Sequence, residues 1–271
     1  MTKTTGVIEG YVKAPPTVSR EGDVATIDAQ GIYYRQLNEA VREAVAAGAK
    51  RVVLNEVNGQ RYIGTGVAGA DVTIEVHGTA GSDLGMFLDG PAVEVFGNAQ
   101  DGVGNTMNAG TVVVRGDAGD VLGYGMRGGS VFVKGDVGYR VGIHMKAYEK
   151  NVPVMVCGGK ARDFFGEYMA GGVLVLLGMH TQFSEQPLVG SFVGAGMHGG
   201  VIFLRGTVEP WQCGKEVGIT EATEDDLSVL RPHVEAYAQA LGLDAEEILG
   251  APFTKLAPFS HRPYGKLYAS M

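Results

Sequence analysis

The fold is decided by a pattern that two consecutive segments share, AVEVFGNAQDGVGNTMNAG (residues 92–110) and TVVVRGDAGDVLGYGMRGG (residues 111–129). Each segment begins with aliphatic residues at alternate positions, reaches an anchoring glycine and has a second glycine seven positions later. A methionine follows three positions after the second glycine. The pattern returns about seven times between Val72 and Gly206, at first with a strict period of 19 residues. Internal repetition at a fixed period predicts a repeat architecture.

Equivalent residues of the repeats form four columns. The aliphatic pairs are Ile74/Val76, Val93/Val95, Val112/Val114, Val131/Val133, Val154/Val156, Leu174/Leu176 and Ile202/Leu204. The anchoring glycines are Gly78, Gly97, Gly116, Gly135, Gly158, Gly178 and Gly206. The second glycines are Gly85, Gly104, Gly123, Gly142, Gly166 and Gly194, and the long apolar residues after them are Leu88, Met107, Met126, Met145, Met169 and Met197. An extra residue near Gly159 and a nine-residue insertion around Thr181 to Leu188 interrupt the period.

Alternation with a period of two predicts one β-strand with a buried face in each repeat. Frequent glycine excludes a helix, because each glycine costs about 1 kcal/mol relative to alanine. Since every repeat has one strand in the same place, we expect the strands to stack as a parallel β-solenoid of about seven coils. The aliphatic and methionine columns would fill its interior, and the glycines would form its corners. Leucine-rich repeats and hairpin repeats fit less well, since their leucine pattern and their regular Asn-Gly or Asp-Gly turns are missing.

The segments on either side of the solenoid, which we place at residues 67–207, are expected to cover its ends. Residues 1–66 comprise a polar lead-in (residues 1–30) and an α/β cap, with a helix over residues 31–47 and a strand from Arg51 to Asn55. An open end of a solenoid exposes unpaired strand edges, and we therefore expect this cap to dock on the first coil.

Residues 208–271 contain two predicted helices and a tail. The first helix runs from about Glu224 to Leu241, and Pro232 is expected to kink or divide it. Its apolar residues are Leu227, Leu230, Val234, Tyr237 and Leu241. A second short helix would begin at Asp244 and end at Gly250.

The tail from Ala251 to Met271 is rich in proline and aromatic residues and has little periodicity. We expect it to bind another protein, because aromatic and arginine residues dominate binding hot spots. The alternative is that it seals the last coil of its own solenoid. The residues expected to anchor it on a partner are Phe253, Phe259, Arg262, Tyr264 and Tyr268.

Composition excludes several classes of function. The net charge of −8 and the lack of a basic cluster argue against binding to nucleic acid or to anionic membranes. We expect a cytoplasmic protein, because no apolar signal segment and no stretch of about 20 apolar residues occurs. Cys157 and Cys213 have no C-x-x-C spacing, and Cys157 beside an anchoring glycine is expected to be a reduced packing residue.

The sequence predicts no catalytic, cofactor-binding or metal-binding residue. Three matches to G-x-G-x-x-G begin at Gly64, Gly123 and Gly194, but none opens a helix, and we interpret them as corner glycines. A column of aspartates is expected to cap its own turn amides rather than to bind Ca²⁺. These aspartates are Asp101, Asp120 and Asp163. The histidines, His77, His144, His180 and His198 among them, form no cluster with metal-ligand spacing.

Several longer segments resemble the GXGXG domain of glutamate synthases, and most closely the stand-alone version in archaeal-type split enzymes. They are NGQRYIGTG (residues 58–66), FGNAQDGVGNTMN (96–108), GMRGG (125–129), GYRVGIHMK (138–146), FTK (253–255) and SHRPYG (260–265). The resemblance implies a right-handed parallel β-helix that holds catalytic subunits together and has no catalytic residues itself. It also implies two partners: a class II glutamine amidotransferase subunit and a synthase subunit that holds FMN and an iron–sulfur cluster and makes glutamate from 2-oxoglutarate.

Three alternatives stay open at this point. The first is the equivalent subunit of N-methylglutamate synthase, in which another chain would recognise methylamine. The second is a scaffold like the β-helix subunit of formylmethanofuran dehydrogenase or of the formyltransferase/hydrolase complex, which shares the repeat. The tail and the block that begins at Asn58 favour glutamate synthase over this second alternative. The third is an extracellular sugar-cleaving β-helix, which would require a signal peptide and an acidic or Ca²⁺-binding cleft.

Overall fold

One continuous sheet runs through the protein, whose computed structural model describes residues 15–261. Its strands are β1 (Val18–Glu21), β2 (Val24–Asp28), β3 (Arg51–Asn58), β4 (Thr73–Thr79), β5 (Asp89–Phe96), β6 (Ala109–Val114), β7 (Ser130–Val133), β8 (Val154–Cys157), β9 (Ala170–Leu176), β10 (Gly199–Arg205), β11 (Val217–Glu221) and β12 (Phe253–Pro258). The helices are α1 (Tyr34–Ala46), α2 (Glu224–Leu241), α3 (Ala245–Leu249) and the 3₁₀ turn η1 (Pro210–Gln212).

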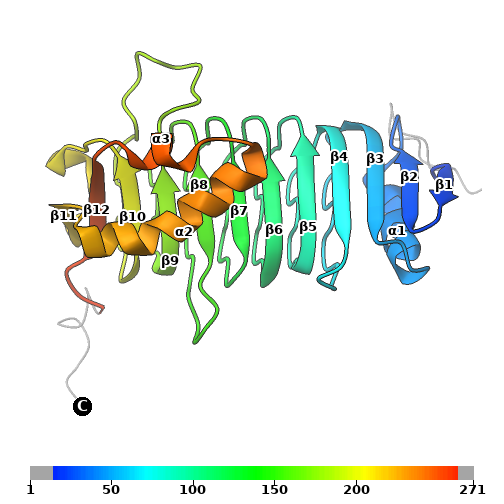
Figure 1. Cartoon of the computed structure of the whole chain (residues 1–271), viewed down its shortest axis with the longest axis horizontal. Helices are drawn as coiled ribbons and strands as arrows, with labels where there is room; N and C mark the ends of the chain where they lie inside the picture. The colour runs from blue at the N-terminus through cyan, green and yellow to red at the C-terminus, as the bar shows by residue number, and fades with distance from the viewer. Residues whose placement is uncertain (1–14, 262–271) are drawn as a thin grey trace, which may run out of the picture.

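Strands β2 to β10 lie side by side in sequence order, and every neighbouring pair among them is parallel. The chain returns from each strand to the next through glycine-rich turns, so that the sheet forms one wall of an elongated tube (Figure 1). This arrangement is the predicted parallel β-solenoid. It has about six turns rather than seven coils, because the seven repeat strands β4 to β10 enclose six connecting turns.

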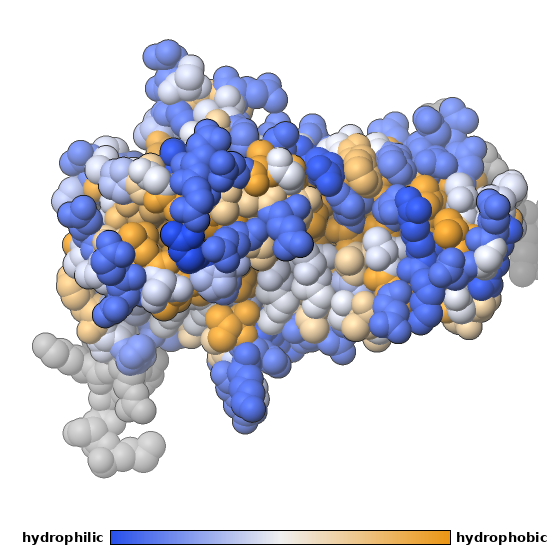
Figure 2. Space-filling view, in the orientation of Figure 1, coloured by the Kyte–Doolittle hydropathy of each residue, from blue (hydrophilic) through white to orange (hydrophobic). Residues whose placement is uncertain are grey.

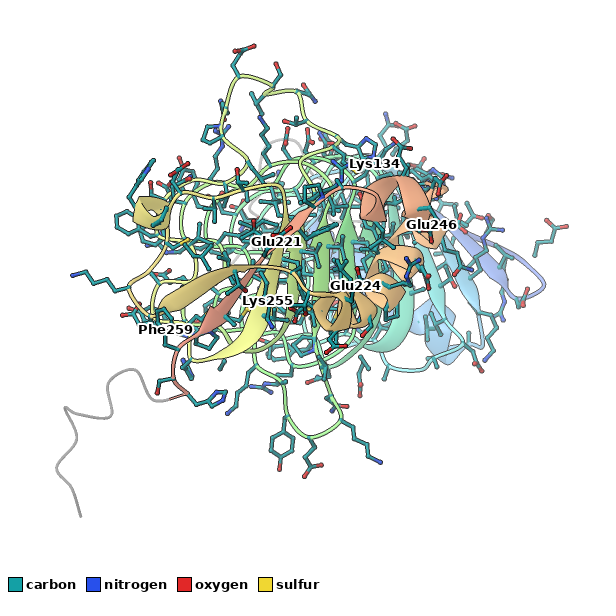
Figure 3. The ribbon with its side chains drawn as sticks, turned by 60° about the vertical axis from the view of Figure 1, so that its left-hand side comes forward. Lys134, Glu221, Glu224, Glu246, Lys255 and Phe259 are labelled. Atoms are coloured by element: carbon teal, nitrogen blue, oxygen red, sulfur yellow. The ribbon has the colours of Figure 1, made fainter. Side chains whose placement is uncertain are left out.

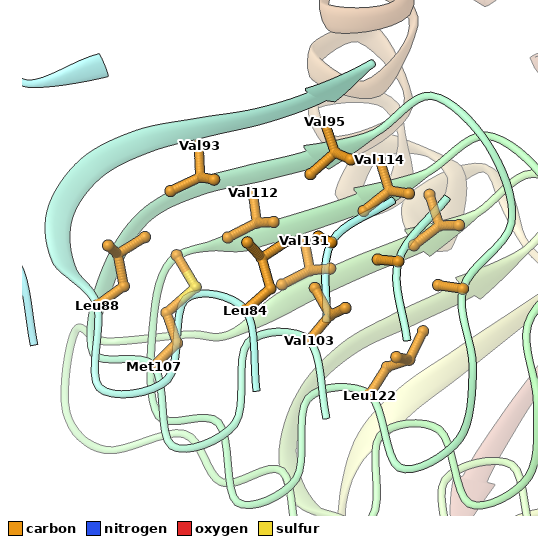
Figure 4. Close-up of a cluster of buried hydrophobic side chains, with 14 of the residues drawn as sticks. Leu84, Leu88, Val93, Val95, Val103, Met107, Val112, Val114, Leu122 and Val131 are labelled. Carbon is orange, nitrogen blue, oxygen red and sulfur yellow. The ribbon is translucent and has the colours of Figure 1, made fainter. Parts of the chain in front are cut away.

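The predicted aliphatic and methionine columns fill the interior of the solenoid (Figure 4). Val112, Val114, Val131 and Val133 are fully buried there, as the 19-residue register predicted. All six residues of the methionine column are fully buried as well. Burying a valine or methionine side chain contributes about 1.5–3 kcal/mol, so a repeated column of them stabilises every coil in the same way.

One coil departs from the predicted register. Strand β8 pairs with β7 so that Val131 lies opposite Met155 and Val133 lies opposite Cys157. Met155 and Cys157 therefore point into the solenoid, and the prediction that Val154 and Val156 do so is wrong. The extra residues of this coil lie in a loop at residues 146–152 rather than near Gly159. The inward-facing positions of β8 are therefore shifted by one residue from the predicted ones.

The N-terminal cap continues the solenoid. Strands β2 and β3 extend the parallel sheet beyond β4, and α1 connects them in place of a glycine corner. The predicted helix is confirmed, with Leu37 and Val41 buried in the common core. The prediction of a polar lead-in over residues 1–30 is wrong for residues 18–28, which form the antiparallel pair β1–β2. Residues 1–14 lie outside the described part of the chain.

Helix α2 packs along the outer face of the sheet (Figure 1). Pro232 lies inside a helix that stays undivided from Glu224 to Leu241. Of the two predicted effects of this proline, a kink or a division, the division is therefore wrong. The short helix α3 follows as predicted, with the Asp244 side chain accepting hydrogen bonds from the first backbone amides. No helix within residues 15–261 has the length and apolar character that crossing a membrane requires.

The beginning of the predicted interaction tail is part of the sheet. Strand β12 pairs antiparallel with β10 on one side and with β11 on the other. Phe253 and Leu256 are buried in the protein itself. The prediction that Phe253 anchors a partner is therefore wrong, and sealing of the protein's own last coil is right for this part. Arg262, Tyr264 and Tyr268 lie outside the described residues.

Two loops project from the solenoid, at residues 146–152 and 179–188 (Figure 1). The second is the predicted nine-residue insertion. Both loops present mostly hydrophilic residues to solvent (Figure 2). They leave the regular coils on either side unchanged, because the strands before and after each loop still pair in parallel.

Candidate functional site

The second glycine of each coil lies between two backbone positions in the left-handed region. These positions fall two residues before and two residues after the glycine, and in the described chain they contain ten of the twelve non-glycine residues with positive φ. A left-handed conformation costs a residue with a side chain about 1–3 kcal/mol and is concentrated at functional sites. The ten residues are Tyr62, Asp83, Val121, Arg140, Phe164 and Phe192 before the glycine, and Phe87, Thr106, His144 and Tyr168 after it.

The glycine at the centre of this corner is required for space as well as for its backbone conformation. A Cβ atom on Gly104 would lie 2.7 Å from the Val131 side chain, and one on Gly123 would lie 2.5 Å from the Met155 methyl group. The central position therefore faces the core. The flanking left-handed positions carry side chains of any size, and several of these are exposed.

Aromatic side chains cluster on the outer surface of this corner. The His144 and Tyr168 rings stack with centroids 5.3 Å apart, and Tyr124 meets His144 edge-on at 5.9 Å. Phe164 and Phe192, which each lie two positions before a second glycine, stack with their ring centroids 4.9 Å apart. We call this surface the corner face, which consists of Phe87, Tyr124, Arg140, His144, Phe164, Tyr168 and Phe192.

The charged groups of the corner face are paired. The Arg140 guanidinium donates to the Glu167 carboxylate at 3.0 Å and lies 4.3 Å from the centre of the Phe164 ring. Both contacts hold the guanidinium flat against the surface. The corner face thus combines exposed aromatic rings, one fixed arginine and a backbone locked by the core beneath it. Protein interfaces are enriched in these residue types.

The aspartate column has a structural use that differs in detail from the prediction. Asp101 accepts a hydrogen bond from the backbone amide of Asp120 at 2.8 Å, and Asp120 accepts one from Tyr139 at 2.9 Å. Each carboxylate therefore binds an amide of the following coil, not of its own turn. Asp163 does the same with Ser191 at 2.8 Å. In residues 15–261 no three His, Cys, Asp or Glu side chains group in a way that could hold a metal ion.

The two cysteine thiols are poor nucleophiles. Burial raises the pKa of Cys157 far above its usual range, and it raises the pKa of Cys213 to about 11. Neither side chain forms a disulfide. Since the thiolate is the reactive form, both groups are inert near neutral pH.

A small cleft of about 190 Å³ lies between the insertion loop and the coils that carry Asp117 and Asp136. Its charged groups bind the protein itself: Lys160 Nζ donates to the carbonyl oxygens of Phe183 at 2.7 Å and Ser184 at 3.0 Å. Asp136 accepts hydrogen bonds from Lys160 N at 2.7 Å and from Thr181 Oγ1 at 3.1 Å. These contacts fix the loop on the solenoid and account for the charged residues of the cleft.

The sequence predicted the glycine corners but not the corner face. The glycines of the G-x-G-x-x-G matches lie at corners, as expected, with Gly64, Gly123 and Gly194 at positive φ. A signal for the corner face was present, because Phe87, His144 and Tyr168 each lie two residues after a column glycine. The structure shows that this position points outward.

Comparisons with known proteins place the repeat in a described family. The family model for the GXGXG motif matches residues 36–259. The uncharacterized protein MJ1350 of Methanocaldococcus jannaschii is 47% identical over 248 residues, which cover 89% of this chain and 95% of that protein. The family model begins inside α1 and ends just after β12, so its match includes the solenoid and helices α2 and α3.

Proposed function

Because the chain belongs to the GXGXG motif family, we propose that it is the non-catalytic scaffold subunit of a glutamate synthase-type complex. Its partners in this proposal are a class II glutamine amidotransferase, which releases ammonia, and a synthase subunit. The synthase subunit holds FMN and an iron–sulfur cluster and uses the ammonia to form glutamate from 2-oxoglutarate. The scaffold keeps the two catalytic subunits together.

The corner face is the observation that carries this proposal. Its aromatic rings lie on a rigid backbone, and they therefore lose little conformational entropy when a partner covers them. Exposed aromatic side chains next to a fixed arginine are the residues that contribute most to binding hot spots. A face that repeats along the solenoid also offers the length that a large subunit needs.

The chemistry of the described residues supports a structural role. The thiols of Cys157 and Cys213 have raised pKa values, and the charged groups around the insertion loop bind one another. In the proposal, catalysis and its cofactors therefore belong to the partner subunits.

Co-expression with the two partner subunits tests the proposal. The tagged chain is expected to retain both subunits, and the assembled complex is expected to convert glutamine and 2-oxoglutarate into glutamate. Assaying the complex with methylamine in place of glutamine distinguishes N-methylglutamate formation. A tagged chain that retains neither subunit would contradict the proposal.

A matched pair of variants locates the docking surface. Tyr168 and Phe183 have nearly equal exposure, 42% and 43%, but only Tyr168 lies on the corner face. Tyr168→Glu is expected to lower retention of a partner at least about tenfold, which corresponds to about 1.4 kcal/mol. Phe183→Glu, in the insertion loop, is expected to leave retention unchanged. Equal retention by both variants would remove the corner face from the proposal.

A further inference from the structure

Strand β11 ends the sheet at the C-terminal end of the solenoid, and its outer edge has no strand beside it in the described residues. Its register shows which backbone groups face that edge. Phe259 N donates to Glu216 O and Ala222 N donates to Phe253 O, so the residues bonded to β12 alternate from Glu216 to Ala222. Val217, Ile219 and Glu221 lie between them, and their backbone groups are directed away from β12. Val217 N donates to Gly214 O at 3.1 Å, so the amides that face the edge and are open to a further strand are those of Ile219 and Glu221.

The opposite end of the sheet is protected against further pairing. Strand β1 has only four residues, all of them exposed, and includes Arg20 and Glu21. The Arg20 side chain donates to the carbonyl oxygens of Gly22 at 3.0 Å and Ala47 at 2.7 Å. Short, charged edge strands prevent a second strand from pairing. Strand β11 has no charged residue before Glu221 and lacks this protection.

Apolar surface surrounds the edge of β11. A cleft of about 430 Å³ is lined by Val208, Ile219 and Phe253, among other residues. Phe259 and Trp211 have the highest exposure of the large hydrophobic residues in the described chain, 76% and 73%. Both belong to this end of the solenoid: the Phe259 ring lies against Gly218 of β11, and Trp211 lies in η1, in the segment that leads into β11.

The charge near this edge is negative. Glu216 precedes β11, Glu221 is its last residue and Glu224 begins α2. These three carboxylates outnumber the exposed Lys215 ammonium, which directly precedes Glu216, so the charge is negative on balance. Lys255 on the neighbouring strand is paired with Asp226 at 2.5 Å, so its charge is neutralised. Figure 3 shows Glu221, Lys255 and Phe259 along β11 and β12. A segment bound here would be favoured by positive charge.

We propose that the edge of β11 binds an extended segment of another polypeptide by β-strand addition, and that apolar residues alternate with lysine or arginine in this segment. The apolar residues would cover Ile219 and enter the cleft beside it. The backbone of the segment would pair with β11, and its cations would lie near the glutamates. This site is separate from the corner face, and it does not depend on the proposed function.

The probe is a seven-residue peptide in which lysine and valine alternate, capped at both ends. Trp211 is the only tryptophan of the chain, so its fluorescence in the full-length protein reports binding at this end. A saturable change in fluorescence is expected. Two further peptides are N-methylated at alternate residues, one in each phase. We expect one of them to bind at least about tenfold more weakly and the other to bind normally, because a strand directs alternate amides to opposite sides.

Variants of the protein provide the second arm of the test. Ile219→Pro removes an amide that faces the free edge and a side chain that packs partly against the core, so it is expected to abolish binding and to lower the melting temperature while the chain stays folded. Thr220→Val changes a residue whose backbone bonds to β12, and it is expected to bind the peptide normally. Three results would overturn the proposal: no binding, equal binding of both methylated peptides or of a glutamate–valine peptide, or occupation of the edge by a second copy of the chain.

Discussion

The outer face of the sheet differs between its two halves. The central outward-facing residues are Thr26, Val53, Glu75 and Glu94 in β2 to β5, and they are Val113, Phe132, Val156, Val175 and Phe203 in β6 to β10. Helix α2 covers the second group and forms a separate core with it. Within residues 15–261 no helix lies over the first group, and ion pairs such as Arg51–Glu75 lie on this part of the face. The repeat thus specifies the interior of every coil, whereas the outward residues decide where a further element packs.

The largest effect is expected from breaking a corner, because both halves depend on the interior. Gly123→Val would place a β-branched residue at φ 64°, with its Cβ 2.5 Å from the Met155 methyl group. Strain and overpacking together are expected to lower the free energy of unfolding by about 3–5 kcal/mol. Lys134→Val, after strand β7, is the control and is expected to cost about 0.5 kcal/mol or less. Thermal melting curves with equal shifts for the two variants would contradict the assignment of faces.

Truncating an outward residue separates the two halves directly. Phe132→Ala, under α2, is expected to cost about 3–5 kcal/mol, because it leaves a cavity beside Tyr237. Glu94→Ala, in the uncovered half, removes only a partly exposed ion pair with Arg115 and is expected to cost less than about 1 kcal/mol. Urea unfolding measures both. Similar losses would mean that the two halves are not different.

Removing one oxygen atom is a finer test of the covered half. The Tyr237 hydroxyl is buried beneath α2, and no hydrogen-bond partner for it lies in the described structure. Burying such a group without a partner costs about 1–3 kcal/mol. Tyr237→Phe is therefore expected to keep or slightly raise the free energy of unfolding. A loss of more than about 1 kcal/mol would reveal a hydrogen bond to this hydroxyl.

The smallest expected effect is the loss of folding stability at acidic pH. Burial on α2 lowers the pKa of His233, so the folded protein resists protonation that the unfolded chain accepts. The stability should be complete above the unfolded pKa of about 6.5 and should decrease as the pH falls below it. His180, whose pKa is also lowered by burial, contributes in the same direction. His233→Gln is expected to reduce the change in urea midpoint between pH 7.5 and pH 5.5; an unchanged slope would exclude His233 as a cause.

The interior and the corners could be predicted from the sequence because one column of residues has one environment in every coil. Prediction failed where two possible registers of a strand gave the same alternation of apolar residues. Val154 and Val156 alternate as well as Met155 and Cys157 do, and only the length of the preceding loop decides which pair points inward. Outward-facing apolar residues such as Val113 and Phe132 indicate that a helix covers the sheet. They can be recognised as outward-facing only after the two inward-facing residues of the same strand have been identified.

The fold of the C-terminal tail and the existence of the corner face could not be predicted for a different reason. Strand β12 forms by pairing with β10 and β11, which lie 32 or more residues earlier, and its own sequence has little periodicity. The outward direction of Phe87, His144 and Tyr168 follows from left-handed backbone conformations that a residue with a side chain seldom adopts. Both features depend on the assembled solenoid.

Hydrogen–deuterium exchange of the chain with and without its synthase-type partner tests the central claim most directly. The account predicts that, after the partner is added, exchange slows in the segments that carry the corner face, at residues 83–88, 121–126, 140–144, 164–168 and 190–196. The uncovered outer face, at Glu75 and Glu94, and the exposed side of α2 should exchange at the same rate as before. Protection confined to α2 or to β3–β5, with none at the corner, would contradict it.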